Sequence, residues 1–173
     1  MHIMVLGAGI IGGTTAWYLR QAGHQVTLVE RHGGPARETS YANGGQISVS
    51  HAEPWANPST PWKVLRWLSR EDAPLLFRPR LDPAQWGWAL RFLRECAPWR
   101  SERYVTELVN LGLYSRASLQ ALRQELGLDY DQRSQGILHF YTSESEFQRA
   151  GKPARIMRNA GCDRRMVWPE DIV

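Results

Sequence analysis

After Met1 the chain reads His2-Ile3-Met4-Val5-Leu6-Gly7-Ala8-Gly9-Ile10-Ile11-Gly12, an apolar run followed directly by glycines with the spacing G-x-G-x-x-G. A second apolar run, residues 26–29, ends in Glu30. This order of strand, glycine turn, helix, strand and acid is the dinucleotide-binding fingerprint in its full context. It predicts an α/β fold of the Rossmann type, with parallel strands joined by a helix over residues 10–22 that ends at Gly23.

Each part of the fingerprint has a chemical reason. Gly7 lets the chain turn tightly out of the first strand, Gly9 lets backbone approach a pyrophosphate, and Gly12 lets helix and strand pack closely. The helix amino terminus then offers unpaired N–H groups to the phosphates. Glu30 is placed to accept hydrogen bonds from ribose hydroxyls, so the expected ligand is an ADP moiety without a 2′-phosphate. A glycine-rich turn that binds nothing is the alternative.

A P-loop is the nearest rival, because Gly7, Gly12 and Thr14 match its spacing. The position that must hold the phosphate-binding lysine is Gly13. Nucleotide hydrolysis therefore has no support in this motif.

The composition is that of a globular enzyme, with 43% hydrophobic and 22% charged residues and no repeat. At 173 residues we expect one domain, or one domain and part of another. The opening apolar run lacks the basic start of a signal peptide, and no run of about twenty apolar residues is present to span a membrane. Cys96 and Cys162 are expected to be reduced, partly buried thiols of a cytoplasmic protein. The five histidines lack the spacing of metal ligands, so we predict no metal.

A family resemblance extends these expectations. The chain resembles the D-amino acid dehydrogenases, members of the glycine oxidase and D-amino acid oxidase superfamily of FAD enzymes. The resemblance covers nearly the whole chain and is carried by residues 5–12, 16–19, 21–24, 38–40, 43–48, 52–56, 114–116 and 119–123.

The resemblance implies a cofactor, FAD, and a set of residues that hold it. The first segment cradles the pyrophosphate, an acid and an arginine after the second strand hold the adenosine half, and a glycine-rich loop runs beside the pyrophosphate and the flavin ring. The implied residues are Ile3, Met4, Val5, Leu6, Gly7, Ala8, Gly9, Ile10, Ile11, Gly12, Gly13, Thr14, Thr15, Ala16 and Trp17, then Glu30 and Arg31, then Ser40, Asn43, Gly44, Gly45 and Gln46. Three positions depart from the usual family residues: Glu30, Tyr41 and Gly44.

The rest of the chain reads as helical and connecting. Helices are predicted over 62–69, 83–96 and 101–126, the last with Tyr104, Leu108, Leu111, Ser115, Leu119, Leu122 and Leu126 on one buried face and Gly127 as its end. A strand is predicted over 136–141, and Ser143 with Glu146 predicts a capping box for a helix that reaches Asn159 and ends at Gly161. We therefore expect residues 1–60 to be the first part of an FAD-binding domain, and residues 61–173 to be a helical insertion and the beginning of an α+β substrate domain.

Residues 62–103 form an aromatic and basic stretch. It contains five tryptophans and nine Lys or Arg residues against five acids, a net charge of +4. Three interpretations fit this composition. The stretch could form amphipathic helices whose Arg stems cover aromatic surface, a face that lies on an anionic membrane, or a surface that binds nucleic acid. No recognition motif supports nucleic acid, so we predict none as a partner, and a membrane face would suit a dehydrogenase that passes electrons to a quinone.

The function implied by the resemblance is FAD-dependent oxidation of D-amino acids such as D-alanine to imino acids, which hydrolyse to 2-oxo acids and ammonia, with a respiratory acceptor. A glycine or sarcosine oxidase, and a non-catalytic FAD-binding fragment or subunit that needs a partner chain, are the alternatives. No second βαβ unit follows Glu30 before Val173, so the fold is expected to be incomplete, with a C-terminal half or partner subunit missing. No catalytic residue can be assigned. The expected location is the cytoplasm, with possible attachment to the inner membrane face.

Overall fold

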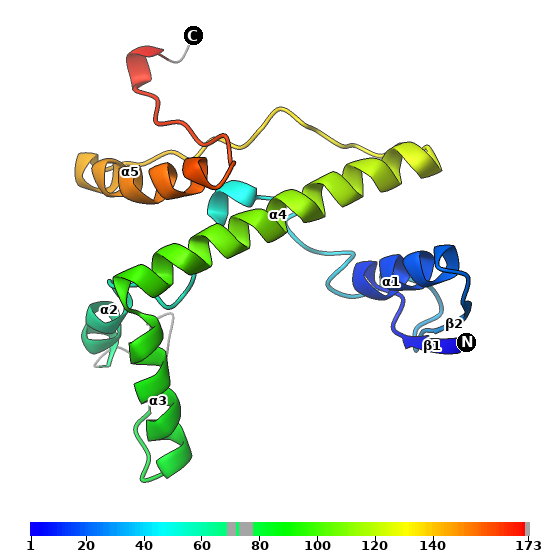
Figure 1. The fold of residues 1–173 in the computed structure, drawn as a ribbon, viewed down its shortest axis with the longest axis horizontal. Helices are drawn as coiled ribbons and strands as arrows, with labels where there is room; N and C mark the ends of the chain where they lie inside the picture. Colours follow the sequence, from blue (N-terminus) through cyan, green and yellow to red (C-terminus); the bar gives the residue numbers. More distant parts are fainter. Residues whose placement is uncertain (69–71, 73–77, 172–173) are drawn as a thin grey trace. The chain divides into compact units, whose positions relative to one another are not determined.

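The computed structural model describes residues 1–68, 72 and 78–171 (Figure 1). They form two compact units, Met1–Gln46 and Ile47–Val173. The prediction that residues 1–60 and 61–173 are the two domains stays a prediction.

The first unit is the predicted βαβ element. Strand β1 (His2–Leu6) runs parallel to β2 (Gln25–Val29), and helix α1 (Ile10–Gln21) connects them. The register pairs His2 with Gln25 and Leu6 with Val29, so both strands end at the same edge. The predicted α/β class and the parallel pair are confirmed.

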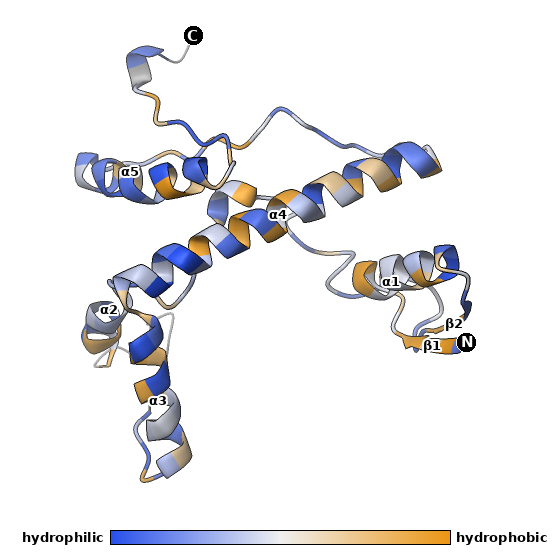
Figure 2. Cartoon of the chain, in the orientation of Figure 1, coloured by the Kyte–Doolittle hydropathy of each residue, from blue (hydrophilic) through white to orange (hydrophobic). Residues whose placement is uncertain are grey.

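Burial within this unit is slight. Ala8 is its one buried residue, and no residue of α1 is buried. Ile11 and Tyr18, which stand at helical spacing, are exposed along with Met4 and Leu6 of β1. Figure 2 shows β1 as a nearly continuous hydrophobic strand, a composition typical of a parallel strand covered on both faces.

The second unit is helical. After the short 3₁₀ helix η1 (Val49–His51) come α2 (Thr60–Trp67), α3 (Pro83–Glu95), α4 (Pro98–Leu126) and α5 (Glu144–Asn159), followed by the 3₁₀ helix η2 (Pro169–Asp171). The four predicted helices are confirmed within a few residues, although the predicted end of the first, Ser69, lies outside the described residues. Helix α4 begins three residues earlier than predicted because Pro98 occupies a first-turn position, where a missing N–H costs nothing.

The predicted buried face of α4 is wrong. Of the seven predicted residues only Leu122 is buried, whereas Leu108, Leu111, Ser115 and Leu126 are exposed, and Tyr104 and Leu119 are half-buried. The helix instead buries Ser101, Val105, Val109 and Leu122. Smaller side chains face inward because η1 and α5 lie against this helix, and a Cβ on Gly112 would already touch Val49 at 3.4 Å.

The core of the second unit is compact and small. It consists of Val49, Val105, Val109, Met157 and Cys162, from η1, α4, α5 and the segment after α5. Both cysteines are free and buried. Burial raises the pKa of both thiols.

Two further predictions in this unit are wrong. Residues 136–141 form no strand, because the only sheet among the described residues is the β1–β2 pair and a strand requires a hydrogen-bonded neighbour. Helix α5 does begin after Ser143 and ends as predicted, but no side-chain bond caps it. The Ser143 hydroxyl lies 2.9 Å from Ser145 Oγ instead, so the predicted capping box does not form.

Within the described part of the chain, no helix has the length and apolar character needed to cross a membrane.

Candidate cofactor-binding site

The glycine turn after β1 is under strict steric constraint. Gly7 has φ +94°, a left-handed conformation that side chains rarely adopt. A Cβ on Gly12 would lie 1.8 Å from the Gly7 carbonyl oxygen, a distance that no side chain can occupy. These two glycines let the first turn of α1 lie directly on the end of β1.

Glu30, at the end of β2, is bound to this turn. Its Oε2 accepts a hydrogen bond from the Ala8 amide at 2.7 Å, and its Oε1 accepts one from the His32 amide at 2.9 Å. Because hydrogen bonds to a carboxylate favour its charged form, these two bonds hold the pKa of the Glu30 carboxyl below its usual range. The acid predicted from sequence is therefore an oriented carboxylate beside the glycine turn.

Ser40 approaches the turn from the loop that follows β2. Its Oγ accepts a hydrogen bond from the Ile10 amide, the first N–H of α1, at 2.9 Å. The same oxygen lies 2.9 Å from the position that a Cβ on Gly9 would occupy. The Ala36 amide, in a left-handed residue with φ 55°, donates to the Ala8 carbonyl at 3.0 Å. The loop is thus fastened to the turn at two points.

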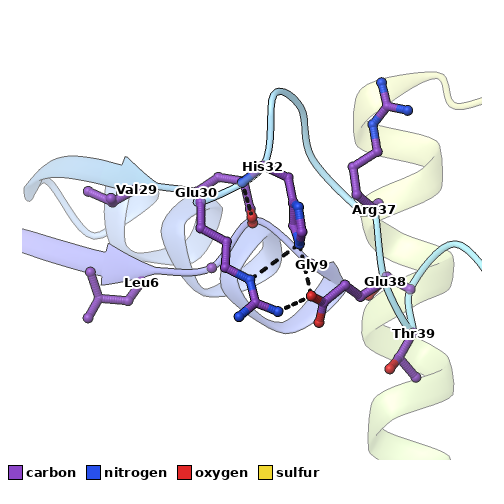
Figure 3. A pocket seen from close by; sticks show the side chains of 12 residues that line it. Leu6, Gly9, Val29, Glu30, His32, Arg37, Glu38 and Thr39 are labelled. Atoms are coloured by element: carbon purple, nitrogen blue, oxygen red, sulfur yellow. Dashed lines mark hydrogen bonds and ion pairs between the residues drawn. The ribbon is translucent and has the colours of Figure 1, made fainter.

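A cavity of about 530 Å³ opens between the turn and this loop (Figure 3). Six of the residues predicted from sequence line it: Leu6, Gly7, Gly9, Glu30, Arg31 and Ser40. The other predicted residues do not line it: Ile3, Met4 and Val5 lie in β1, Ala8 in the turn, 10–17 in α1, and Asn43, Gly44, Gly45 and Gln46 in the loop beyond Ser40. Asn43 shapes that loop, because its Oδ1 accepts from the Gly45 amide at 2.7 Å.

Sequence reasoning missed three titratable residues of the cavity, His32, Arg37 and Glu38. Glu38 pairs with the Arg31 guanidinium and lies 2.8 Å from His32 Nε2, and Figure 3 shows it turned toward His32 while Arg37 extends away. The His32 and Arg31 contacts lower the pKa of Glu38. The local signal is the presence of two acids and two arginines within residues 30–38, which predicts ion pairs but not which residues pair.

The arrangement fits the ADP half of a dinucleotide. Side chains at Gly9 and Gly12 would collide with Ser40 and with the Gly7 carbonyl, and the helix amino terminus beside this turn favours an anion. An oriented carboxylate at the end of the second strand is the group that binds ribose hydroxyls.

Comparison with known proteins places the chain in a family. Residues 2–173 match the DAO family of FAD dependent oxidoreductases. The chain belongs to this family. The resemblance stated from sequence is therefore confirmed.

Several curated relatives are similar to this chain over nearly its whole length. The D-amino acid dehydrogenase of Dechloromonas aromatica is 60% identical over 167 residues, which are 96% of this chain and 40% of that protein. The D-amino acid dehydrogenase of Paramagnetospirillum magneticum is 54% identical over 95% of this chain and 39% of that protein. The D-amino acid dehydrogenase of Phenylobacterium zucineum is 48% identical over 93% of this chain and 38% of that protein. The chain spans about two fifths of the length of these relatives, and no solved structure matches it.

Proposed function

We propose that this chain is the FAD-binding part of a D-amino acid dehydrogenase. The observation that carries the proposal is the Glu30 carboxylate oriented against the Ala8 amide, beside a glycine turn that excludes side chains. The similarity to proteins named D-amino acid dehydrogenase supports the substrate class. D-alanine is the proposed substrate, with 2-oxo acid and ammonia as final products and a respiratory acceptor for the electrons.

The proposed roles of the residues follow from their positions. Glu30 accepts from the ribose, the α1 amino terminus with Gly9 receives the pyrophosphate, and Arg31 contacts the adenosine half. The residues 40 and 43–46 form the loop beside the pyrophosphate and flavin ring. Bound FAD supplies the hydride-accepting chemistry, and the protein's part is to hold and orient the reactants.

Recognition of the substrate carboxylate calls for a bidentate arginine. None of the arginines of this chain is assigned that role, and no catalytic residue is assigned. Since the relatives are about two and a half times as long as the matched segment, we propose that catalysis needs the remaining polypeptide, in the same chain or in a partner subunit.

Cofactor titration tests the proposal. Fluorescence titration with FAD and calorimetry with ADP should show weaker binding by Glu30→Ala and still weaker binding by Gly9→Val, because a side chain there fills phosphate space. Gly33→Ala is the matched control, since Gly33 does not line the cavity and a Cβ there meets nothing within 4 Å. Unchanged affinity in Gly9→Val would show that the fingerprint is not the binding site.

Turnover assays separate the alternatives. We expect the 173-residue chain alone to show no dye reduction with D-alanine and to hold FAD weakly. Robust dye reduction by the purified chain would contradict the need for further polypeptide. Oxygen consumption with glycine or sarcosine would favour the oxidase alternative.

A peripheral membrane contact is proposed for the aromatic and basic stretch. Trp62 and Trp99 are 74% and 71% exposed, so Arg stems do not cover them. Exposed tryptophans among arginines favour an anionic membrane surface, the place where a dehydrogenase would meet a quinone. Sedimentation with anionic vesicles at low and high salt tests this contact.

A further inference from the structure

Two neighbouring residues after β2 favour different nucleotides. Glu30 is the kind of acid that accepts hydrogen bonds from ribose hydroxyls, and its charge repels a 2′-phosphate, whereas an arginine in this region accommodates one. The next residue is such an arginine, Arg31, whose side chain is 75% exposed and lines the cofactor cavity. The preference of the cavity between the two kinds of nucleotide therefore depends on how the Arg31 charge is engaged.

The charge of Arg31 is engaged by a second acid, Glu38. An ion pair joins Arg31 Nη2 to Glu38 Oε1. Arg31 Nε lies 3.3 Å from His32 Nε2, and the same ring nitrogen lies 2.8 Å from Glu38 Oε1, so the three side chains are in mutual contact. Figure 3 shows Glu38 and His32 facing each other, while Arg37, the other arginine that lines the cavity, extends away from them.

The contacts of this network favour the charged forms of its members. The hydrogen bonds with His32 and then with Arg31 lower the pKa of Glu38. The hydrogen bond and the charge of Glu38, followed by the charge of Glu30, raise the pKa of Arg31. Arg31 and Glu38 therefore form a pair without net charge beside the negative Glu30.

The loop that carries Glu38 fixes its position. The Glu38 carbonyl oxygen accepts hydrogen bonds from the Tyr41 amide at 2.8 Å and the Ala42 amide at 3.3 Å. Within this turn, Ser40 Oγ accepts from the Ile10 amide at the start of α1, at 2.9 Å. The ion pair and the contact with the glycine turn are thus made by one short segment, which is already ordered when a nucleotide arrives.

We propose that Glu38 is a specificity-determining residue, which cancels the charge of Arg31 so that Glu30 can exclude nucleotides that carry a 2′-phosphate. The class that the cavity accepts is then an adenine nucleotide with a free 2′-hydroxyl, as in ADP and FAD. Without Glu38 the guanidinium of Arg31 would attract the 2′-phosphate, because arginine forms strong charge-assisted hydrogen bonds with phosphate oxygens. This inference rests on the proposed function, since it takes the cavity to be the cofactor site.

Calorimetric titration of the full chain with two probes, ADP and ADP that carries a 2′-phosphate, tests the role of Glu38. The ratio of the two dissociation constants is compared, because a general weakening of the site cancels in it. Glu38→Gln removes the partner charge of Arg31, so we expect the preference for ADP to fall about fivefold, the upper end for exposed ion pairs. Arg31→Gln should raise the preference by a similar factor. The double variant, which lacks both charges, should return to the ratio of the parent.

Glu107→Gln is the matched control, because the Arg103–Glu107 pair is exposed to nearly the same degree, 76% and 52%, and does not line the cavity. Its ratio should equal that of the parent, and circular dichroism should show that the variants keep their helices. The shift expected of Arg31→Gln keeps the test decisive if Glu38→Gln does not fold. All shifts should shrink as added salt screens the charges.

Equal ratios in the parent and the single variants would overturn the role of Glu38. A lowered preference for ADP that persists in the double variant would also overturn it, because the effect would then not depend on the charge of Arg31. In both cases a parent that prefers ADP would leave the proposed function standing. A parent that binds neither probe would contradict the proposed function and this inference together.

Discussion

The Gly7 carbonyl oxygen lies 1.8 Å from the place where a Cβ on Gly12 would stand. Helix α1 can therefore rest on the end of β1 only while position 12 has no side chain. We predict that Gly12→Ala destabilises the first unit by more than the ~1–3 kcal/mol typical of an overpacked core, because the obstructing atom belongs to the backbone. Hydrogen exchange of the β1 and β2 amides measures this loss.

Gly13→Ala is the control for that substitution. A Cβ at Gly13 meets nothing, and alanine in a helix is favoured over glycine by about 0.5–1 kcal/mol. Slower exchange in Gly13→Ala and faster exchange in Gly12→Ala is the expected pair of results. Equal protection in the two variants would contradict the close contact of turn and helix.

A second prediction concerns the contact between Gly9 and Ser40. Gly9→Ala places a Cβ 2.9 Å from Ser40 Oγ, and we expect a loss of about 1 kcal/mol or more in the stability of the first unit. Adding Ser40→Ala should recover most of that loss, because the next atom, Ser40 Cβ, lies at 3.9 Å. A double-mutant cycle gives the coupling. ADP affinity should stay low in the double variant if Gly9 also admits the pyrophosphate, which separates the steric role from the ligand role.

A third prediction concerns pH. Burial lowers the pKa of His139, and Arg164 and His51 act in the same direction while Glu53 opposes them. Because the folded-state pKa is below the unfolded value of about 6.5, the unfolded chain binds more protons as pH falls through this range. The contribution of His139 is therefore fully present above the unfolded pKa and is lost as pH falls through the folded value.

The free energy of unfolding measured against pH tests this sign. In His139→Gln the decline on the acid side of about pH 6.5 should be shallower than in the parent. A steeper decline, or profiles that coincide after a constant offset, would show that His139 does not titrate differently in the folded chain.

A fourth prediction concerns the aromatic and basic stretch. The chain should sediment with anionic vesicles at low salt and be released as salt screens the attraction. Trp88→Ala with Trp99→Ala should reduce the bound fraction, because both indoles are exposed within the stretch. Trp55→Ala should not reduce it, although Trp55 is even more exposed, because Trp55 lies outside residues 62–103. Equal recovery of the chain in the supernatant with and without vesicles would contradict a membrane face. It would leave the interpretation that Arg side chains of the stretch cover aromatic surface.

The parts of the fold that sequence predicted are those with local causes. The glycine spacing determines β1, α1 and β2, and proline and glycine positions mark the helix ends. The buried face of α4 was mispredicted because the helix carries two apolar rows, one through Leu108 and Leu111 and one through Val105 and Val109. Contact with Val49, far away in sequence, selects the second row.

The same difference between local and long-range causes explains which residues of the site could be predicted from sequence. Glu30 could be predicted because its distance from the glycines is set by one helix and one strand. The approach of Ser40 to Ile10, and of Glu38 to Arg31 and His32, depends on how the loop turns back, for which no local pattern was available. The strand at 136–141 was mispredicted for a related reason, since pairing requires a distant partner.

The two internal hydrogen bonds of Glu30 have a consequence for the speed of ligand capture. A carboxylate has about four acceptor positions, and the Ala8 and His32 amides use one on each oxygen. Because the Arg31 amide also acts on this carboxylate and lowers its pKa, at least one acceptor position remains for a ribose hydroxyl. An arriving adenosine group would therefore add to an existing network without displacing any bond and without waiting for a side chain to find its rotamer.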